Sequence, residues 1–179
     1  MTRAHSDLSG ADPLLRLTNA AMMTALIFLF TFLIKVPTVV GYIHLGDAFI
    51  LLYAAVTADP LALLAGALGE GLADLAGGYY QYLPATVIIK ALIALPVFLA
   101  AKKDAERGPR PKSCSRRVFL SALPSVPITL GGYFIVDYLL AGAYAFPALG
   151  TNAVQSVGSL LVFAALAAGF DKSPLKRMI

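Results

Sequence analysis

Ionisable residues inside long apolar segments are the feature that most limits how this chain can fold. Glu70 and Asp74 interrupt one apolar segment, and Lys90 interrupts the next. A charged side chain at the centre of a membrane helix costs about 2.5 to 3.5 kcal/mol or more, unless it is paired or hydrated. Such residues therefore face other protein segments or a water-filled cavity. The chain must fold so that these charges meet one another or a ligand.

The composition places these segments in a membrane. Hydrophobic residues make up 59% of the 179 residues and charged residues 13%, against roughly 45–50% and 25% in soluble domains. A helix of about 20 apolar residues crosses a bilayer, so we expect a single membrane domain over residues 1–179. The expected fold is an all-α bundle of six transmembrane helices. They cover residues 17–36, 45–58, 61–75, 84–101, 118–144 and 152–170.

Lysine and arginine residues gather before the first segment, in the loop 102–117 and after residue 170. Cytoplasmic loops carry an excess of these residues, so both termini and the loop 102–117 are expected on the cytoplasmic side. The same loops account for the net charge of +4 without a nucleic-acid partner. The single cysteine, Cys114, lies in that loop, and neither a disulfide nor a cysteine-based metal site is expected.

Polar residues within the segments are concentrated in the outer half of the expected bundle. A helix rises about 1.5 Å per residue, which places Glu70 and Lys90 at similar depths below the outer surface. Glu70 and Asp74 are four residues apart and share one helix face. Because the inner halves are almost purely apolar, we expect a polar pocket that opens outward and is closed below. The candidate substrate-binding residues are Asp47, Glu70, Asp74, Tyr79, Lys90, Tyr133, Asp137, Asn152 and Gln155.

Some of these residues have a simpler interpretation that the sequence leaves open. Glu70 and Lys90 are also compatible with a purely structural ion pair, and Asp47 with an ordinary helix cap. His44 is interpreted as a loop residue. Five tyrosines are more typical of an aromatic belt at the membrane surface than of a stacking site, whereas Tyr133 lies deeper. Those five are Tyr42, Tyr79, Tyr80, Tyr82 and Tyr144.

Four stretches carry a resemblance to a known family. They are GYIHLGDA at 41–48, PLALLAGALGEGLAD at 60–74, GGYY at 77–80 and PATVIIK at 84–90. On these motifs the chain resembles the substrate-binding S component of an energy-coupling factor (ECF) vitamin transporter, in the group for riboflavin, pyridoxine or hydroxymethylpyrimidine. The chain departs from the family pattern at 58–60, where relatives often have Gly-Pro. That departure lies on the expected cytoplasmic side and does not bear on the choice of substrate.

The resemblance implies a binding subunit and not an enzyme. Such proteins bind a vitamin from outside with high affinity and associate with a transmembrane T component and two cytoplasmic ATPase subunits. Small residues of the first helix form the contact with the T component in this family, and the matching positions here are Ala21 and Ala25. The implied location is the prokaryotic plasma membrane, as a multi-pass protein in contact with the lipid bilayer. No cofactor and no metal ion are expected.

Two other functions are alternatives. A solitary proton-coupled carrier would use Glu70 or Asp74 as its titrating group, but it needs a polar path to the cytoplasm that the apolar inner halves do not offer. An intramembrane aspartyl protease would use Asp74 and Asp137 as a pair that shares a proton. These residues lie at compatible depths, but the usual Gly-x-Gly-Asp context is missing. Copurification of ATPase subunits would favour the ECF interpretation over both.

Overall fold

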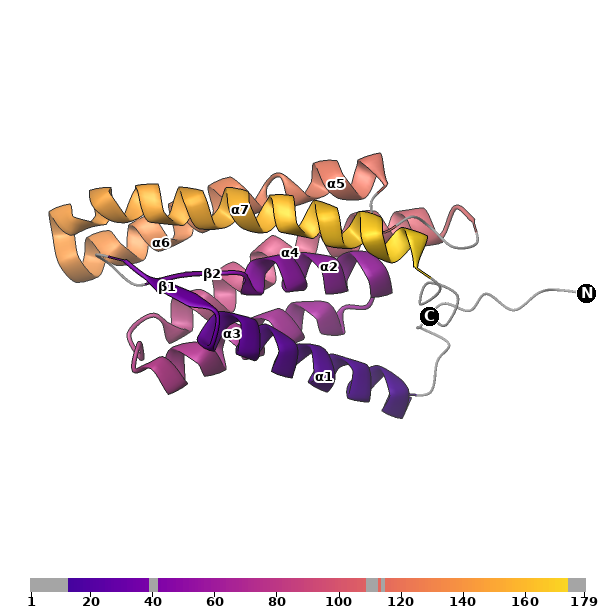
Figure 1. Ribbon diagram of the computed structural model, residues 1–179, viewed down its shortest axis with the longest axis horizontal. Helices are drawn as coiled ribbons and strands as arrows, with labels where there is room; N and C mark the ends of the chain where they lie inside the picture. Colours follow the sequence, from indigo (N-terminus) through magenta and orange to yellow (C-terminus); the bar gives the residue numbers. More distant parts are fainter. Residues whose placement is uncertain (1–12, 39–41, 109–112, 114, 174–179) are drawn as a thin grey trace, which may run out of the picture.

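The computed structural model describes residues 13–38, 42–108, 113 and 115–173 (Figure 1). In chain order its elements are α1 (Pro13–Phe32), β1 (Lys35–Pro37), β2 (Tyr42–His44), α2 (Gly46–Thr57), α3 (Leu61–Gly77), α4 (Leu83–Ala105), α5 (Arg116–Ala122), α6 (Ser125–Ala141), the 3-10 helix η2 (Gly142–Tyr144) and α7 (Ala145–Lys172). Cys114 and the basic residues Arg110 and Lys112 lie outside the described residues.

The helices form an elongated bundle in which α1 and α7 lie on opposite sides (Figure 1). The start of α1 and the end of α7 lie at the same end of the bundle, together with the end of α4. The turn between α3 and α4 and the 3-10 helix η2 lie at the other end. This arrangement agrees with an even number of crossings, although the side of the membrane on which each end lies stays a prediction.

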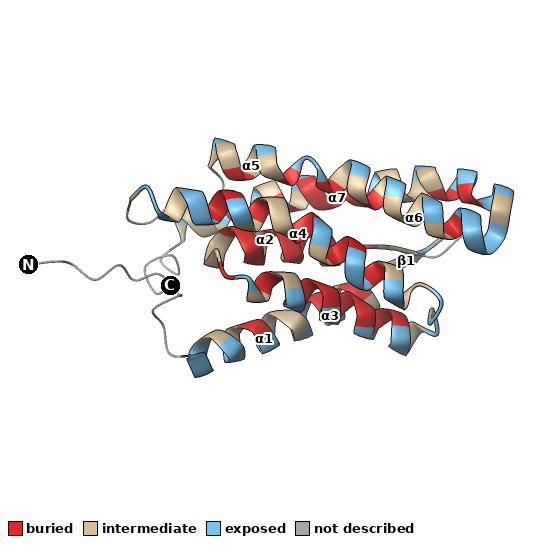
Figure 2. Ribbon diagram, turned by 180° about the vertical axis from the view of Figure 1, so that it is seen from behind, coloured by how far each residue is buried: buried red, intermediate tan, exposed pale blue. Residues whose placement is uncertain are grey.

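Apolar side chains cover the outside of the bundle, and its interior combines an apolar core with buried polar residues. Leu139 is 79% exposed, whereas Lys90 is fully buried, and Figure 2 shows buried residues along the helix faces that meet in the centre. Many other large apolar side chains are also exposed, and such a surface suits contact with lipid and not with water. Within the described residues, three helical stretches are long and apolar enough to cross a membrane, Pro13–Phe32, Leu83–Ala105 and Arg116–Lys172. The protein is therefore embedded in a membrane, while the count of six crossings stays a prediction.

Small residues of α3 let three helices meet closely. A Cβ atom on Gly69 would lie 2.9 Å from the carbonyl oxygen of Thr24 in α1, and one on Gly66 would lie 2.9 Å from the side chain of Ile50 in α2. Close approach through small residues is how helices pack in lipid, where no hydrophobic force drives them together. The consequence is that α3 lies inside the bundle with Glu70 and Asp74 buried.

The chain between α1 and α2 forms an antiparallel β-hairpin, which the all-α expectation did not include. Lys35 is the register partner of His44, and Pro37 that of Tyr42. The helix α1 therefore ends at Phe32 and not at residue 36. With 12 residues, α2 is about 18 Å long, too short for a hydrocarbon core of about 30 Å. The hairpin lies next to the start of α2 and extends along the bundle (Figure 1), and it brings residues 42–44 toward the interior.

The expected fifth segment, 118–144, is divided into α5 and α6. Ser115 caps α5, since its Oγ accepts a hydrogen bond from the backbone N–H of Val118 at 3.1 Å. The break falls at Pro124, where α5 has ended and α6 begins, because a proline has no N–H to continue a helix and clashes with the preceding turn. The last helix, α7, begins at Ala145 and not at residue 152.

Arg16 and Asp59 fasten the first turns of α1 to the turn between α2 and α3. Nε of Arg16 donates to Oδ2 of Asp59 at 2.7 Å, and Nη2 donates to Oδ1 at 3.0 Å. The backbone N–H of Leu61 donates to the same Oδ1 at 2.9 Å. Burial by itself would raise the pKa of Asp59, but the hydrogen bonds from Arg16 and Leu61 outweigh it and hold that pKa below its ordinary value. The ionised form is therefore the one that stabilises the fold.

Asp59→Asn is expected to lower the midpoint of thermal unfolding in detergent at pH 7. A folded-state pKa below the unfolded value of about 3.9 means that the ion pair stabilises the protein above that pH and is lost as the pH falls through the folded value. The difference from wild type should therefore shrink towards pH 3. Glu106→Gln, at an exposed carboxylate after α4, is the control and should change nothing. A deficit that is equally large at pH 3 would rule out the ion pair as its source.

Candidate functional site

A pocket lies at the end of the bundle that holds the turn between α3 and α4. The hairpin, α3, that turn, α6 and α7 contribute its walls. Its lining consists of Tyr42, His44, Glu70, Asp74, Tyr79, Tyr82, Tyr133, Asp137, Asn152 and Gln155. The space that the centre of a water molecule can reach is about 60 Å³, against roughly 300–1,000 Å³ in ligand pockets. A ligand larger than a few water molecules therefore requires side chains at the mouth to move.

The structure brings most of the candidate residues to this pocket. Seven of them are in its lining: Glu70, Asp74, Tyr79, Tyr133, Asp137, Asn152 and Gln155. The other two, Asp47 and Lys90, do not line it and are buried directly behind it. The role of all nine residues in binding stays a prediction.

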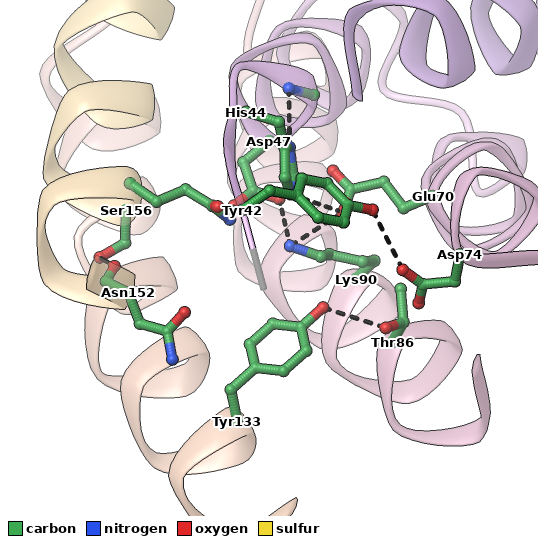
Figure 3. A network of polar contacts seen from close by, with 12 residues as sticks. Tyr42, His44, Asp47, Glu70, Asp74, Thr86, Lys90, Tyr133, Asn152 and Ser156 are labelled. Atoms are coloured by element: carbon green, nitrogen blue, oxygen red, sulfur yellow. Dashed lines mark hydrogen bonds and ion pairs between the residues drawn. The ribbon is translucent and has the colours of Figure 1, made fainter. Parts of the chain in front are cut away.

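Lys90 is the centre of a buried network behind the pocket. Its Nζ lies 2.6 Å from Oδ1 of Asp47 and 3.0 Å from Oε2 of Glu70, and 5.2 Å from the ring centre of Tyr133. Nε2 of Gln155 donates to the second oxygen of Asp47 at 3.2 Å. Figure 3 shows the ammonium directed between the two carboxylates. The helices α2, α3, α4 and α7 are thereby joined, and the lining residue Glu70 is held in place.

Asp47 has a different role from the helix cap considered above. The helix α2 has no side-chain cap at its start, and the Asp47 carboxylate binds Lys90 and Gln155 instead. A Cβ atom at the preceding residue, Gly46, would lie 2.6 Å from Oε1 of Glu70. The start of α2 thus packs directly on the network, and only glycine fits at that position without displacing Glu70.

His44 is a neutral member of the pocket wall. The backbone N–H of Gly46 donates to its Nδ1 at 3.2 Å, so Nδ1 carries no proton. Its Nε2 lies 3.5 Å from Oε2 of Glu70. Burial, with the nearby Lys90 ammonium, lowers the pKa of His44 to about 3, which agrees with a neutral ring. The imidazole therefore presents an N–H towards Glu70 and adds no positive charge.

Four tyrosines form a row around the pocket. The ring centres of Tyr42 and Tyr79 are 5.2 Å apart, those of Tyr79 and Tyr82 are 6.3 Å apart, and those of Tyr82 and Tyr133 are 6.4 Å apart. These separations are typical of interacting aromatic pairs. The belt interpretation therefore misplaces three of the five tyrosines to which it was applied, which lie in the pocket lining. Tyr80 and Tyr144, the other two, are exposed.

Hydrogen bonds connect this row to the pocket's carboxylates. The hydroxyl of Tyr42 donates to Oδ1 of Asp74 at 3.2 Å, and that of Tyr82 donates to Oδ1 of Asp137 at 2.8 Å. The second oxygen of Asp74 is buried and has no hydrogen-bond partner within the described residues. Within the part of the chain that the structure describes, no hydrogen bond or ion pair joins Asp74 to Asp137. Each carboxylate is thus held by its own tyrosine.

Sequence reasoning missed Tyr42, His44 and Tyr82 as lining residues. Tyr42 and His44 reach the pocket only because the chain turns back through the hairpin. A signal for a strand was present, since the run KVPTVV at 35–40 is rich in β-branched residues. Tyr82 gave no such signal, because its position depends on the geometry of the α3–α4 turn.

Ala21 and Ala25 are exposed on α1 and are not in the pocket lining. Their neighbours Ala20 and Ile27 are buried on the opposite side of the helix. The two alanines therefore lie on the outer surface of the bundle. Among the described residues, no group of three or more His, Cys, Asp or Glu side chains is placed to hold a metal ion.

The comparisons with known proteins agree with the geometry. No curated protein matches the chain. The sequence model of the family described as "ECF-type riboflavin transporter, S component" matches residues 14–172, which span all five structural elements that contribute to the pocket wall. A family of transporter subunits is not a family of enzymes, and neither the protease nor the solitary carrier finds support in it. The chain belongs to this family and is the substrate-binding subunit of an ECF transporter.

Proposed function

We propose that the protein binds a water-soluble vitamin or vitamin precursor of the riboflavin, pyridoxine or hydroxymethylpyrimidine class with high affinity. The observation that carries the proposal is the pocket, in which four tyrosine rings alternate with carboxylate, amide and imidazole groups. Planar polar heterocycles suit such a lining, because their faces stack on aromatic rings and their edges need a few well-placed polar partners. The proposed ligand contacts are Glu70, Asp74, Tyr79, Tyr133, Asp137, Asn152 and Gln155, joined by Tyr42, His44 and Tyr82.

The protein is proposed to act as part of an importer in the prokaryotic plasma membrane. Six crossings would place both termini in the cytoplasm and the pocket towards the outside. Membership of the family supports a transmembrane T component and two ATPase subunits as partners. The basic residues Lys102 and Lys103, exposed near the end of α4, support a cytoplasmic position for the end of the bundle opposite the pocket.

The arrangement of the acidic residues argues against the alternative functions. An aspartyl protease needs two carboxylates that share a proton, but Asp74 and Asp137 are held by separate tyrosines. A proton-coupled carrier needs a polar path to the cytoplasm. Beyond Lys90 the centre of the bundle is filled by apolar side chains such as Ile93 and Val97, which are buried. A pocket that is closed below suits a subunit that relies on partners for release.

The orientation can be tested by labelling cysteines introduced at the two ends of the bundle. Gln81→Cys lies in the turn beside the pocket and Glu106→Cys lies after α4, and both positions are exposed. In a Cys114→Ser background, we expect a membrane-impermeant maleimide added to intact cells to label Gln81→Cys only. Glu106→Cys should be labelled only after the membrane is opened. The reverse pattern would place the pocket on the cytoplasmic side and contradict the proposed import.

The assembly can be tested by purifying the tagged protein from its native membranes in mild detergent. We expect a second membrane protein and ATPase subunits to copurify, and ATP hydrolysis to copurify with them. Ala21→Trp should lose these partners, because a bulky side chain there separates the helices that would otherwise pack closely. A protein that imports its substrate without any copurifying ATPase would contradict the proposal and favour a solitary carrier.

A further inference from the structure

The charges around the pocket are unbalanced. Glu70, Asp74 and Asp137 are in its lining, which includes no lysine or arginine. Lys90, behind the lining, is already shared between Asp47 and Glu70. Four carboxylates thus surround one ammonium, so the region stays negative even if one carboxyl group holds a proton. His44 does not restore the balance, because its ring is neutral.

A second cation, Lys35, lies beside the pocket wall. The Nζ of Lys35 lies 4.5 Å from the ring centre of Phe32 and 5.1 Å from that of Tyr42. It forms no ion pair with a carboxylate within the described residues. The positive charge of Lys35 is thus placed against aromatic rings at the hairpin, and the hydrogen bonds to Asp74 and Asp137 come from neutral hydroxyl groups.

The unpaired oxygen of Asp74 adds a direct requirement for a donor. Oδ2 of Asp74 is buried without a partner within the described residues, and a buried acceptor without a donor is unfavourable. A ligand N–H, O–H or ammonium group would satisfy it. A ligand oxyanion would place a second negative charge against it and leave it without a donor.

The aromatic row favours the same ligands. The face of a tyrosine ring carries negative partial charge and attracts cations. Tyr79 and Tyr82 present two such rings beside the carboxylates, and the rings of Tyr42 and Tyr133 already lie near the cations Lys35 and Lys90. Rings and carboxylates together form an environment that attracts positive charge and repels negative charge.

From this combination we propose that the pocket selects its ligand by charge, accepting a planar ring with hydrogen-bond donors or a positive charge and rejecting the phosphate ester of the same ring. The inference rests on the proposed function, since it takes the pocket to be the vitamin site. It predicts that the protein imports the unphosphorylated form of its vitamin. An enzyme that adds phosphate must then act after import if the cell uses the phosphorylated form.

The test is equilibrium binding to the purified protein in detergent, with ligands that share one ring and differ in charge. The first series is pyridoxamine, pyridoxine and pyridoxine 5′-phosphate. Riboflavin and hydroxymethylpyrimidine, each with its phosphate ester, form the other two. For the ring that binds, we expect the phosphate ester to bind about a hundredfold more weakly or worse, because close like charges strongly oppose association. If pyridoxine binds, pyridoxamine should bind at least as tightly.

The source of the discrimination is tested with variants. Asp74→Asn and Asp137→Asn, singly and together, should each reduce the ratio of the dissociation constants of ester and parent ring by about tenfold or more. Each substitution removes one charge that repels the phosphate. Asp104→Asn, in the last turn of α4 outside the pocket lining, is the matched control and should leave the ratio unchanged. Thermal unfolding midpoints show whether each variant is folded. The comparison of parent ring and ester on the wild-type protein does not depend on the variants.

Each outcome decides a different point. If a parent ring binds and its ester binds equally well, the charge selection is wrong and the proposed vitamin-binding function stands. If the ester is rejected but the double variant rejects it equally, the carboxylates are not the cause and the inference is wrong in its mechanism. If no parent ring binds to folded protein, the proposed ligand class fails and the inference fails with it.

Discussion

Replacing Lys90 by methionine is expected to lower the free energy of unfolding by about 3–5 kcal/mol, the usual cost of removing one partner of a buried ion pair. Lys90 is fully buried, and Asp47 and Glu70 are 2% and 1% exposed. Without the ammonium these two carboxylates would face each other with no cation nearby. The affinity for ligand should also fall, because Lys90 holds the lining residue Glu70 and lies against the ring of Tyr133.

The measurement is unfolding in mixed micelles, with ligand affinity determined on the folded fraction. Lys103→Met, at an exposed position of the same helix, removes the same charge and is expected to change little. Adding Glu70→Gln and Asp47→Asn to Lys90→Met should recover part of the lost stability, since neutral side chains no longer repel. If Lys90→Met is as stable as wild type and binds equally well, the network does not support the pocket.

Ala21→Trp and Ala25→Trp are expected to abolish uptake into cells while leaving ligand affinity within a few-fold of wild type. Both alanines lie on the exposed side of α1, and neither is in the pocket lining. Helices in lipid associate by close packing, so a large side chain at a docking surface keeps the partner away. The same side chain cannot reach the ligand site. In a carrier that works without partners, these substitutions should not abolish uptake while the ligand affinity is preserved.

The two quantities are measured in pairs, as uptake of labelled vitamin by cells and as affinity in detergent. Ala165→Trp is the control, because Ala165 is also an exposed alanine but lies on α7, on the other side of the bundle (Figure 1). It should permit normal uptake. Normal uptake by both α1 variants would show that this surface is not the docking site. Loss of binding in both would show that the substitutions damage the fold.

Helix periodicity and depth were enough to predict that Glu70 and Lys90 meet, whereas Asp74, predicted in the same network, accepts a hydrogen bond from Tyr42 instead. Spacing along a helix fixes which residues share a face, and rise per residue fixes their depth. The resulting contact between Lys90 and Glu70 is present at 3.0 Å. The same reasoning could not show that Lys90 is behind the pocket wall, because that depends on the direction in which its long side chain turns.

The residues that sequence reasoning placed wrongly belong to parts of the chain without helical periodicity. The hairpin depends on pairing between β1 and β2, and its register cannot be derived from helix rules. Asp47 appeared suited to cap a helix because only its local context was visible. Its actual partners, Lys90 and Gln155, are distant in sequence. A proline such as Pro124 indicates a distortion of the helix, but the completeness of the break depends on how α5 packs.

Mass spectrometry of small molecules released from the purified protein tests the claim that the pocket holds a vitamin-class ring. The protein would be isolated in mild detergent from cells grown in rich medium and then denatured. We predict release of an unphosphorylated riboflavin-, pyridoxine- or hydroxymethylpyrimidine-type ring, and much less of it from a Lys90→Met preparation. Consistent release of a phosphorylated compound would contradict the charge selection, and release of a ligand outside these ring classes would contradict the claim itself.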